Sequence, residues 1–351
     1  MIALAKHRYG PIGVDLGRRS VKMLQMTHDR GRVVEAARWD LSPDADEADA
    51  EIRYQALADG LRQLCKSRNF RGREAVLCLG GDQLFVQNIR VARSAEAEVS
   101  RLVTQEAAAR VPYSIAEAEI RFIETADIRQ GDSTKREIVL LACHRPALTR
   151  LLQIIDDAGL RPVAVDVEPV ALLRCYSHQL RRDEDRHQRA MFVHVGQSNT
   201  AVVIAQGKSP LFVKYLEIGG RNFDEAVAAN LEMELHAAAL LRRHNGDRRS
   251  EQQDPEIARS VGKAIRPIVE RLTNELSLCV RYHSVTFRGQ PLARMVLGGG
   301  EATAPLAEVF SHALDLPCLL GEPLRTYKNE ASLGRQSQWD VAAGLALRAT
   351  E

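Results

Sequence analysis

The sequence lacks any hydrophobic run long enough to cross a membrane. The longest apolar runs, 138–143 and 201–205, are far shorter than the roughly 18 to 20 residues that a bilayer requires. The start MIALAKHRYG has no signal-peptide core either. We therefore expect a cytoplasmic protein without a transmembrane segment.

An excess of charge of one sign is also missing. The 351 residues include 48 Lys and Arg against 46 Asp and Glu, a net charge of +2. No overall positive field draws such a chain onto nucleic acid, so we expect no nucleic-acid partner. The six cysteines form no C-x-x-C pair and have no His at metal-ligand spacing, which indicates reduced, buried thiols.

Familiar catalytic motifs are absent as well. There is no G-x-S-x-G elbow and no H-E-x-x-H helix, and the ten histidines are scattered. The glycine run at 298–300 lacks the G-x-G-x-x-G spacing of a nicotinamide site. Hydrolases of these kinds and dinucleotide enzymes are therefore disfavoured.

A repeated pattern of strands and glycine turns is present. The first part of the chain predicts three antiparallel strands, a helix and a fourth strand (12–17, 20–26, 33–41, 57–64, 75–79). The middle repeats the strand, glycine hairpin and strand pattern (191–196, 200–205, 211–218). Placing Asp15 over His194 puts Gly17 over Gly196, which indicates an internal duplication.

Four segments follow from this duplication. We expect a first lobe core in 1–83 and 161–189, an inserted α+β subdomain in 84–160 with the order β-α-β-β-α, a second lobe core in 190–220 and 295–351, and a helical or α+β outer subdomain of the second lobe in 221–294. Two charged stretches without aromatics, 181–189 and 242–260, are typical of solvated connections.

The first glycine hairpin combines residues that suit phosphate. Gly17 lets backbone N–H groups form an anion-binding concavity, Asp15 suits water-mediated Mg²⁺ and Lys22 lies on the returning strand. Taken alone, Asp-x-Gly is an ordinary hairpin turn. Asp166 and Glu168 share one face of a strand, a pattern that suits water activation or, equally, the cap of a following helix.

Together these features resemble the actin-like ATPase superfamily and, more narrowly, the FtsA-related PilM group of type IV pilus assembly proteins. The resemblance covers nearly the whole chain and includes further motifs at 105–107, 111–113, 139–143, 158–160, 165–168, 218–220, 297–300 and 341–348. It implies an α/β, actin-like (ribonuclease H-like) fold of two lobes with duplicated β-β-β-α-β-α halves, which close on Mg-ATP.

The resemblance also implies a role for each matching position. Asp15 would orient Mg²⁺ through water, Gly17 and Ser20 would meet the phosphates, and Lys22 would reach the β-phosphate. The second phosphate loop would contain Gly196 and Thr200, and the adenosine pocket would be lined by Gly298, Gly299 and Gly300. Glu168 lies in a family connecting motif without an assigned role.

At two places the sequence differs from the family pattern in ways that affect nucleotide binding and hydrolysis. The second loop begins with His194, expected to be neutral, where the family has Asp, and the helix expected to contact the base carries His236 and Arg242. They leave two alternatives open: Mg-ATP binding with little or no hydrolysis, and weak or absent nucleotide binding. We therefore expect a nucleotide-binding scaffold of a pilus or related secretion machine.

The resemblance implies recruitment to the inner membrane by the N-terminal cytoplasmic tail of a single-pass PilN-like protein, alongside other pilus-assembly components. The seam near Phe85 and Tyr113 of the inserted segment is the expected docking site, unless both are only core residues. An active ATPase or small-molecule kinase and an FtsA-like membrane-associated filament protein are the alternatives; 344–351 has no basic amphipathic anchor.

Overall fold

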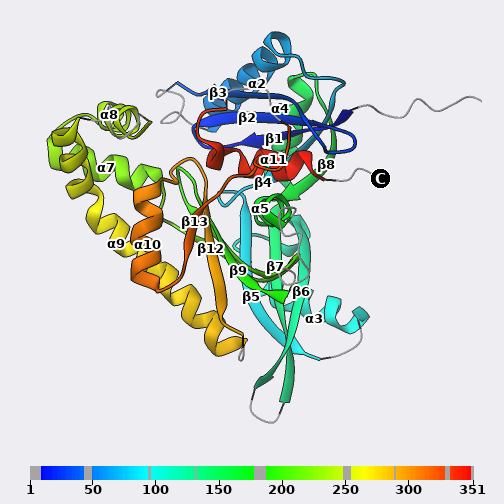
Figure 1. Cartoon of the computed structure of the whole chain (residues 1–351). Helices are drawn as coiled ribbons and strands as arrows, with labels where there is room; N and C mark the ends of the chain where they lie inside the picture. The colour runs from blue at the N-terminus through cyan, green and yellow to red at the C-terminus, as the bar shows by residue number, and fades with distance from the viewer. Residues whose placement is uncertain are drawn as a thin grey trace, which may run out of the picture.

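A computed structural model of the chain describes residues 9–42, 50–93, 96–130, 133–177, 187–247, 254–287, 290–328 and 333–348. These residues form three sheets with helices packed around them (Figure 1). No helix in these ranges has the length and apolar character needed to cross a bilayer.

Two of the sheets are built alike. The first has the order β3 (Val33–Asp40), β2 (Ser20–Thr27), β1 (Tyr9–Leu16), β4 (Glu74–Leu79), β8 (Arg161–Val167). The second has the order β11 (Ser209–Leu216), β10 (Thr200–Gln206), β9 (Arg189–Val195), β12 (Leu292–Gly298), β13 (Cys318–Leu320). In each sheet the first three strands are antiparallel and the last two are parallel. The duplication predicted from the glycine hairpins is therefore confirmed.

Helices cover both faces of the first sheet. Its outer face packs against α2 (Ala50–Ser67) and α4 (Arg145–Asp157), whose leucines and isoleucines recur at helical spacing in the core. The opposite face packs against α11 (Asp340–Ala346), which also contacts α5 (Glu168–Ser177). We refer to this sheet and these helices as the first lobe.

The second sheet carries the longer helices. Its core side chains pack against α9 (Pro255–Thr286) and α10 (Ala304–Leu314). Each helix begins with a side-chain cap, because Asp254 accepts hydrogen bonds from the first turn of α9 and Thr303 accepts one from the first turn of α10. With α7 (Gly220–Leu231) and α8 (Leu235–Asp247), this sheet and its helices form the second lobe.

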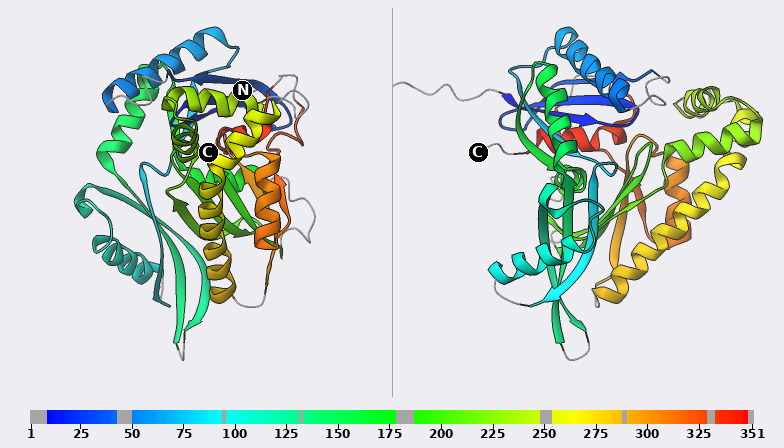
Figure 2. Two further views of the ribbon diagram at one scale, coloured as in Figure 1. Left: turned by 90° about the vertical axis from the view of Figure 1, so that its left-hand side faces the viewer. Right: turned by 180° about the vertical axis from the view of Figure 1, so that it is seen from behind.

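The third sheet has the order β5 (Leu84–Ala92), β7 (Ser133–His144), β6 (Ala118–Gln130) and packs on α3 (Glu96–Ala108). The β6–β7 pair projects at the opposite end of the molecule from α2 (Figure 2). This sheet contacts the second lobe: the Asn88 amide donates to the Val213 carbonyl at 2.7 Å, and Tyr282 of α9 hydrogen-bonds buried Glu137. The division of the chain into four segments remains a prediction, but α4 packs in the first-lobe core against α2 and β8, with further contacts to β7 of this sheet.

One predicted connection is wrong. The start of 242–260 is helical, since α8 runs to Asp247 and α9 begins at Pro255, while 248–253 lie outside the described residues. Arg242 is only partly exposed, and carboxylates distant in the sequence pair with it. Of the other connection, 181–186 lie outside the described residues, and Arg189 begins β9.

Candidate functional site

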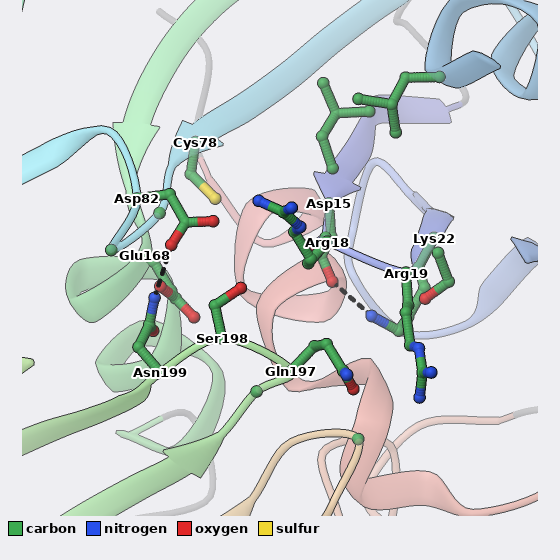
Figure 3. Close-up of a pocket in the computed structure, with 18 of the residues that line it drawn as sticks. Asp15, Arg18, Arg19, Lys22, Cys78, Asp82, Glu168, Gln197, Ser198 and Asn199 are labelled. Atoms are coloured by element: carbon green, nitrogen blue, oxygen red, sulfur yellow. Dashed lines mark hydrogen bonds and ion pairs between the residues drawn. The ribbon is translucent and has the colours of Figure 1, made fainter. Parts of the chain in front are cut away.

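Two glycine hairpins face one cleft between the lobes. In the β1–β2 hairpin, Gly17 N–H donates to the Ser20 carbonyl at 3.1 Å, and in the β9–β10 hairpin Gly196 N–H donates to the Asn199 carbonyl at 2.9 Å. The cleft has a volume of about 410 Å³ and also reaches the 80–83 loop and Gly300 (Figure 3). Because the duplicated sheets present equivalent turns, the two loops lie on its two sides.

Asp15 and Lys22 form an ion pair at the first hairpin. The Lys22 ammonium lies 2.8 Å from a carboxylate oxygen of Asp15, and both side chains are buried. The β1–β2 register pairs the two residues directly across the strands. Asp15, which was expected to hold the metal ion, and Lys22, which was expected to contact phosphate, therefore already bind each other.

His194 takes the equivalent place at the second hairpin. Its Nδ1 lies 2.9 Å from Oδ2 of Asp340, and its Nε2 lies 3.5 Å from Oε1 of Glu168. Asp340 opens α11 and is fully buried, and the other Glu168 oxygen accepts a hydrogen bond from Tyr215 at 2.8 Å. The histidine thus joins the second hairpin to α5 and α11 of the first lobe.

These neighbours decide the charge of His194. Burial lowers its pKa, but the charge and hydrogen bond of Asp340, with smaller contributions from Glu168 and Asp15, raise the pKa from 6.5 to about 9. The buried carboxylates therefore favour the imidazolium form, whereas the sequence led us to expect a neutral His194. Burial also raises the pKa of Glu168, an effect that His194 and Tyr215 partly offset.

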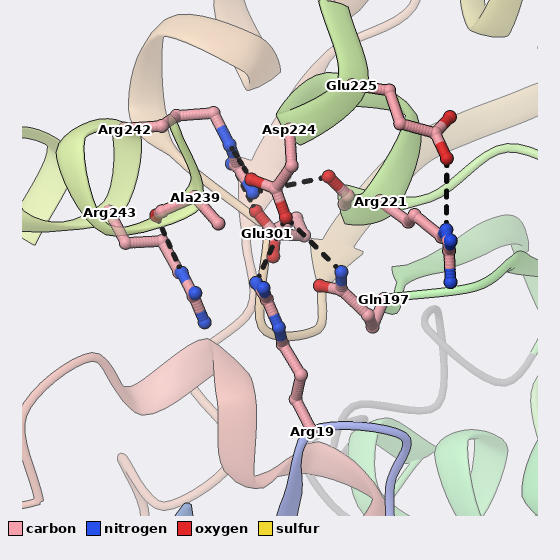
Figure 4. A network of polar contacts seen from close by, with 10 residues as sticks. Arg19, Gln197, Arg221, Asp224, Glu225, Ala239, Arg242, Arg243 and Glu301 are labelled. Atoms are coloured by element: carbon pink, nitrogen blue, oxygen red, sulfur yellow. Dashed lines mark hydrogen bonds and ion pairs between the residues drawn. The ribbon is translucent and has the colours of Figure 1, made fainter. Parts of the chain in front are cut away.

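A second ionic network closes one side of the cleft. Arg242 of α8 binds Asp224 at 2.8 Å and also Glu301, and Arg19 of the first hairpin binds Asp224 at 3.0 Å (Figure 4). Burial raises the pKa of Glu301, but the Arg242 charge outweighs this and lowers the pKa. Arg19 therefore links the first lobe to the second through a carboxylate that is 1% exposed.

The structure brings most of the predicted site residues together. Those that line the cleft are Asp15, Gly17, Ser20, Lys22, Glu168, His194, Gly196 and Gly300. Three others lie behind the lining. Thr200 is fully buried, and its hydroxyl donates to the Ile218 carbonyl at 2.6 Å.

Gly298 and Gly299 have structural reasons to be glycine. A Cβ on Gly298 would lie 2.2 Å from a carboxylate oxygen of Asp340 and 2.6 Å from the Tyr176 hydroxyl. Gly299 has a φ of +97°, and a Cβ there would lie 2.4 Å from the Val195 carbonyl oxygen. Only Gly300 of the glycine run offers the close backbone approach that the sequence suggested.

Several residues of the site escaped the sequence analysis. They are Arg19, Tyr215, Asp224, Arg243, Glu301 and Asp340. Asp340 is recognisable from the sequence, since it is the acid at the start of an apolar helix. Arg19 belongs to the first glycine hairpin. Asp224 and Glu301 had none, because their partners are distant in sequence.

The donor set fits phosphate better than it fits a divalent metal ion. Within the described ranges, seven Arg and Lys side chains line the cleft against four carboxylates, Asp15, Asp82, Glu168 and Glu301. Among the described residues, no group of three or more His, Cys, Asp or Glu side chains is placed to hold a metal ion. Guanidinium groups match phosphate oxygens in geometry and charge, so these residues are suited to a phosphorylated ligand.

The comparisons with known proteins agree with the fold. A family model described as "Type IV pilus assembly protein PilM" matches residues 13–350. A solved structure of a "PilM-PilN type IV pilus biogenesis complex" is 24% identical with a TM-score of 0.80, and the match covers 98% of this chain and 99% of that one. The ethanolamine utilization protein EutJ from Carboxydothermus hydrogenoformans is 15% identical with a TM-score of 0.58, covering 97% and 90%. No curated protein matches.

The predicted fold class is confirmed. Two lobes with sheets of the same strand order, facing each other across a cleft, form the α/β fold of the actin-like ATPases.

Proposed function

The chain belongs to the family of type IV pilus assembly protein PilM, and from this premise we propose that it is a nucleotide-binding scaffold of a pilus or related secretion machine. The observation that carries the nucleotide part is the convergence of two glycine hairpins on a cleft whose described lining includes six arginines. Backbone N–H groups and guanidinium groups together suit the phosphates of ATP. The working form is cytoplasmic and is recruited to the inner membrane by its partner.

Little or no hydrolysis is expected from this cleft. Phosphoryl transfer depends on a positioned carboxylate, metal or water, and at the second hairpin the protein places a buried cation, His194. Asp15, the residue expected to hold magnesium, is bound to Lys22, so we assign no step to a metal ion. The side chains of the second hairpin orient phosphate and do not activate water.

The partner proposal comes from the solved PilM-PilN complex. We infer that the N-terminal cytoplasmic tail of a PilN-like inner-membrane protein binds this chain beside the third sheet. A groove of about 440 Å³ lies between η1 (Ile115–Glu117) and the start of α4, lined by Glu117, Pro146 and Thr149 among others. Tyr113 is near this groove, because its ring stacks on His144, which hydrogen-bonds Glu117.

Tyr113 itself has features of a binding residue. Its hydroxyl is buried without a hydrogen-bond partner, and burial raises its pKa to about 12. The residue as a whole is only partly buried, so the exposed part of its ring is available for contact with a bound peptide. Phe85, in contrast, packs in the core of the third sheet against α3, so it belongs to the structure of the subdomain.

The nucleotide part is tested by thermal unfolding. ATP at a hundredfold excess over Kd stabilises the native state by about 2.7 kcal/mol, so the melting temperature rises. Turnover is measured in the same samples. Absence of the rise at millimolar ATP contradicts nucleotide binding, and steady hydrolysis by the wild type that His194→Ala leaves unchanged contradicts the role given to His194.

The partner part is tested by co-purification with a PilN-like tail peptide. Deletion of 84–160 is unsuitable, because it removes α4 from the first-lobe core. Tyr113→Ala should abolish co-purification, whereas Leu240→Ala, which truncates an exposed apolar side chain on α8, should not. If binding follows substitutions in 223–245 instead, the docking site is on the second lobe.

A further inference from the structure

The four carboxylates among the described residues that line the cleft are already bonded within the protein. Asp15 binds Lys22 at 2.8 Å, the Asp82 carboxylate accepts a hydrogen bond from Asn199 at 3.1 Å, and Glu168 accepts one from Tyr215 at 2.8 Å. Glu301 binds Arg242. A metal ion entering the cleft would have to compete with these bonds for every carboxylate, and Mg²⁺ gives up its waters reluctantly.

Arg243 shows the opposite situation. It lines the cleft from α8, and its Nε donates to the Ala239 carbonyl of the same helix at 3.0 Å (Figure 4). In the described part of the chain, no carboxylate lies within ion-pair distance of it. Burial, Arg19 and Arg242 lower the pKa of Arg243, and Asp224 and Glu301, which already pair with Arg242, offset this only in part. A cation in such surroundings is suited to an anion from solution.

His194 adds a cation at the second hairpin. By the symmetry of the two sheets it is the counterpart of Asp15, so a positive group occupies a position where the first hairpin has a carboxylate. Its Nε2 side faces Glu168 and the cleft, while Nδ1 is held by Asp340. The change from Asp to His removes a carboxylate that would help to hold a metal ion, while the charge of His194 itself is offset by Asp340 and Glu168.

From these contacts we propose that the cleft binds the polyphosphate of a nucleotide as the metal-free anion, with Arg243 supplying positive charge that magnesium supplies in other nucleotide sites. The proposal rests on the nucleotide-binding function proposed above. A free nucleoside triphosphate carries more negative charge than its magnesium complex, so a cationic lining binds the free form more strongly. Magnesium therefore acts as a competitor for the ligand and not as a cofactor.

Calorimetric titration of the full-length protein with ATP tests this directly. One titration contains EDTA and the other contains magnesium in excess over ATP. We expect binding in EDTA to be several-fold tighter than in magnesium, and inorganic triphosphate to bind in EDTA as well. Binding that requires magnesium overturns the proposal and leaves the nucleotide-binding function intact. Absence of ATP binding in both buffers overturns the two together.

Two variants assign the effect to residues. Arg243→Gln should weaken ATP binding in EDTA on the order of tenfold, the loss expected for one charge-assisted contact. Arg266→Gln, on an exposed face of α9 beside Glu270, is the matched control and should bind like the wild type. His194→Asp should shift the preference toward the magnesium complex. Unchanged affinity in Arg243→Gln, with an unchanged melting temperature, overturns the proposal even if His194→Asp fails to fold.

Discussion

His194 is the residue on which the charge of the cleft depends most. It is buried among Asp340, Glu168 and, farther away, Asp15, and these carboxylates raise its pKa from 6.5 to about 9 even though burial acts in the opposite direction. Because the folded state binds this proton more tightly than the unfolded state, the proton contributes to stability. The contribution is complete below pH 6.5 and is lost as the pH rises through about 9.

This dependence gives a prediction for His194→Gln. The variant should be less stable than the wild type by on the order of 3 kcal/mol at pH 6. The difference should shrink steadily between pH 7 and pH 10, measured by denaturant unfolding at each pH. A difference that is constant over this range means that His194 is neutral in the folded protein.

Gly298 and Gly300 provide a matched pair at the end of β12. Gly298→Ala brings a methyl group against Asp340 and Tyr176, so we expect it to lower the free energy of unfolding by about 1–3 kcal/mol. Gly300→Ala meets no atom within 4 Å and should change stability little, as denaturant unfolding can verify. Equal losses for both variants would place the strain in the loop backbone instead.

Single-residue roles were the least predictable part of the sequence. Gly17, Gly196 and the acid before the first turn were identifiable because hairpin chemistry is local. The networks were not, since Asp340 meets His194 across 146 positions and Arg19 meets Asp224 across 205. The charge of His194 could not be derived either, because it is set by buried carboxylates on other elements.

At the scale of elements, the contact between α5 and α11 depends on a single glycine. A Cβ on Gly344 of α11 would lie 1.9 Å from the Ala171 carbonyl oxygen of α5, so the two helices pack at backbone distance. Gly344→Ala should lower the melting temperature by several degrees, a loss of about 1–3 kcal/mol from overpacking.

The control for Gly344→Ala lies in another helix. A Cβ on Gly262 of α9 would meet no neighbouring atom within 4 Å, and alanine is the better helix former there. Gly262→Ala should therefore raise stability by up to about 1 kcal/mol. A loss in both variants would indicate a general effect of helix glycines and not the close packing of α5 on α11.

Strands were more predictable than helices with charged faces. The strands of both sheets are short apolar runs between turn residues, so the apolar pattern and the flanking turns both indicate a strand. The helix α8 resembled a loop because its second half carries Arg242, Arg243 and His244. Arg242 is stabilised by Asp224 and Glu301, which only the folded chain brings near to it. Arg243 donates to a backbone carbonyl of α8 itself. The three-residue strand β13 is too short to show a pattern.

For the whole molecule, removing the ion pair between Arg19 and Asp224 tests how much this contact holds the two lobes together. It joins the first hairpin to α7 across the cleft at 3.0 Å. Arg19→Ala should allow the lobes to separate without nucleotide, which small-angle X-ray scattering would detect as a larger radius of gyration. Arg221→Ala removes a pair within α7 and serves as the control. Equal radii for wild type and Arg19→Ala would show that other contacts keep the cleft closed.

The hydrogen bond from Asn88 to Val213 has a thermodynamic consequence for the proposed partner. It anchors the third sheet to the second lobe, while the groove beside Tyr113 is flanked by α4, which belongs to the first. A peptide bound there contacts a seam whose shape depends on the angle between the lobes. If that angle also sets nucleotide affinity, reciprocity requires the peptide to change nucleotide affinity by the same factor by which nucleotide changes peptide affinity.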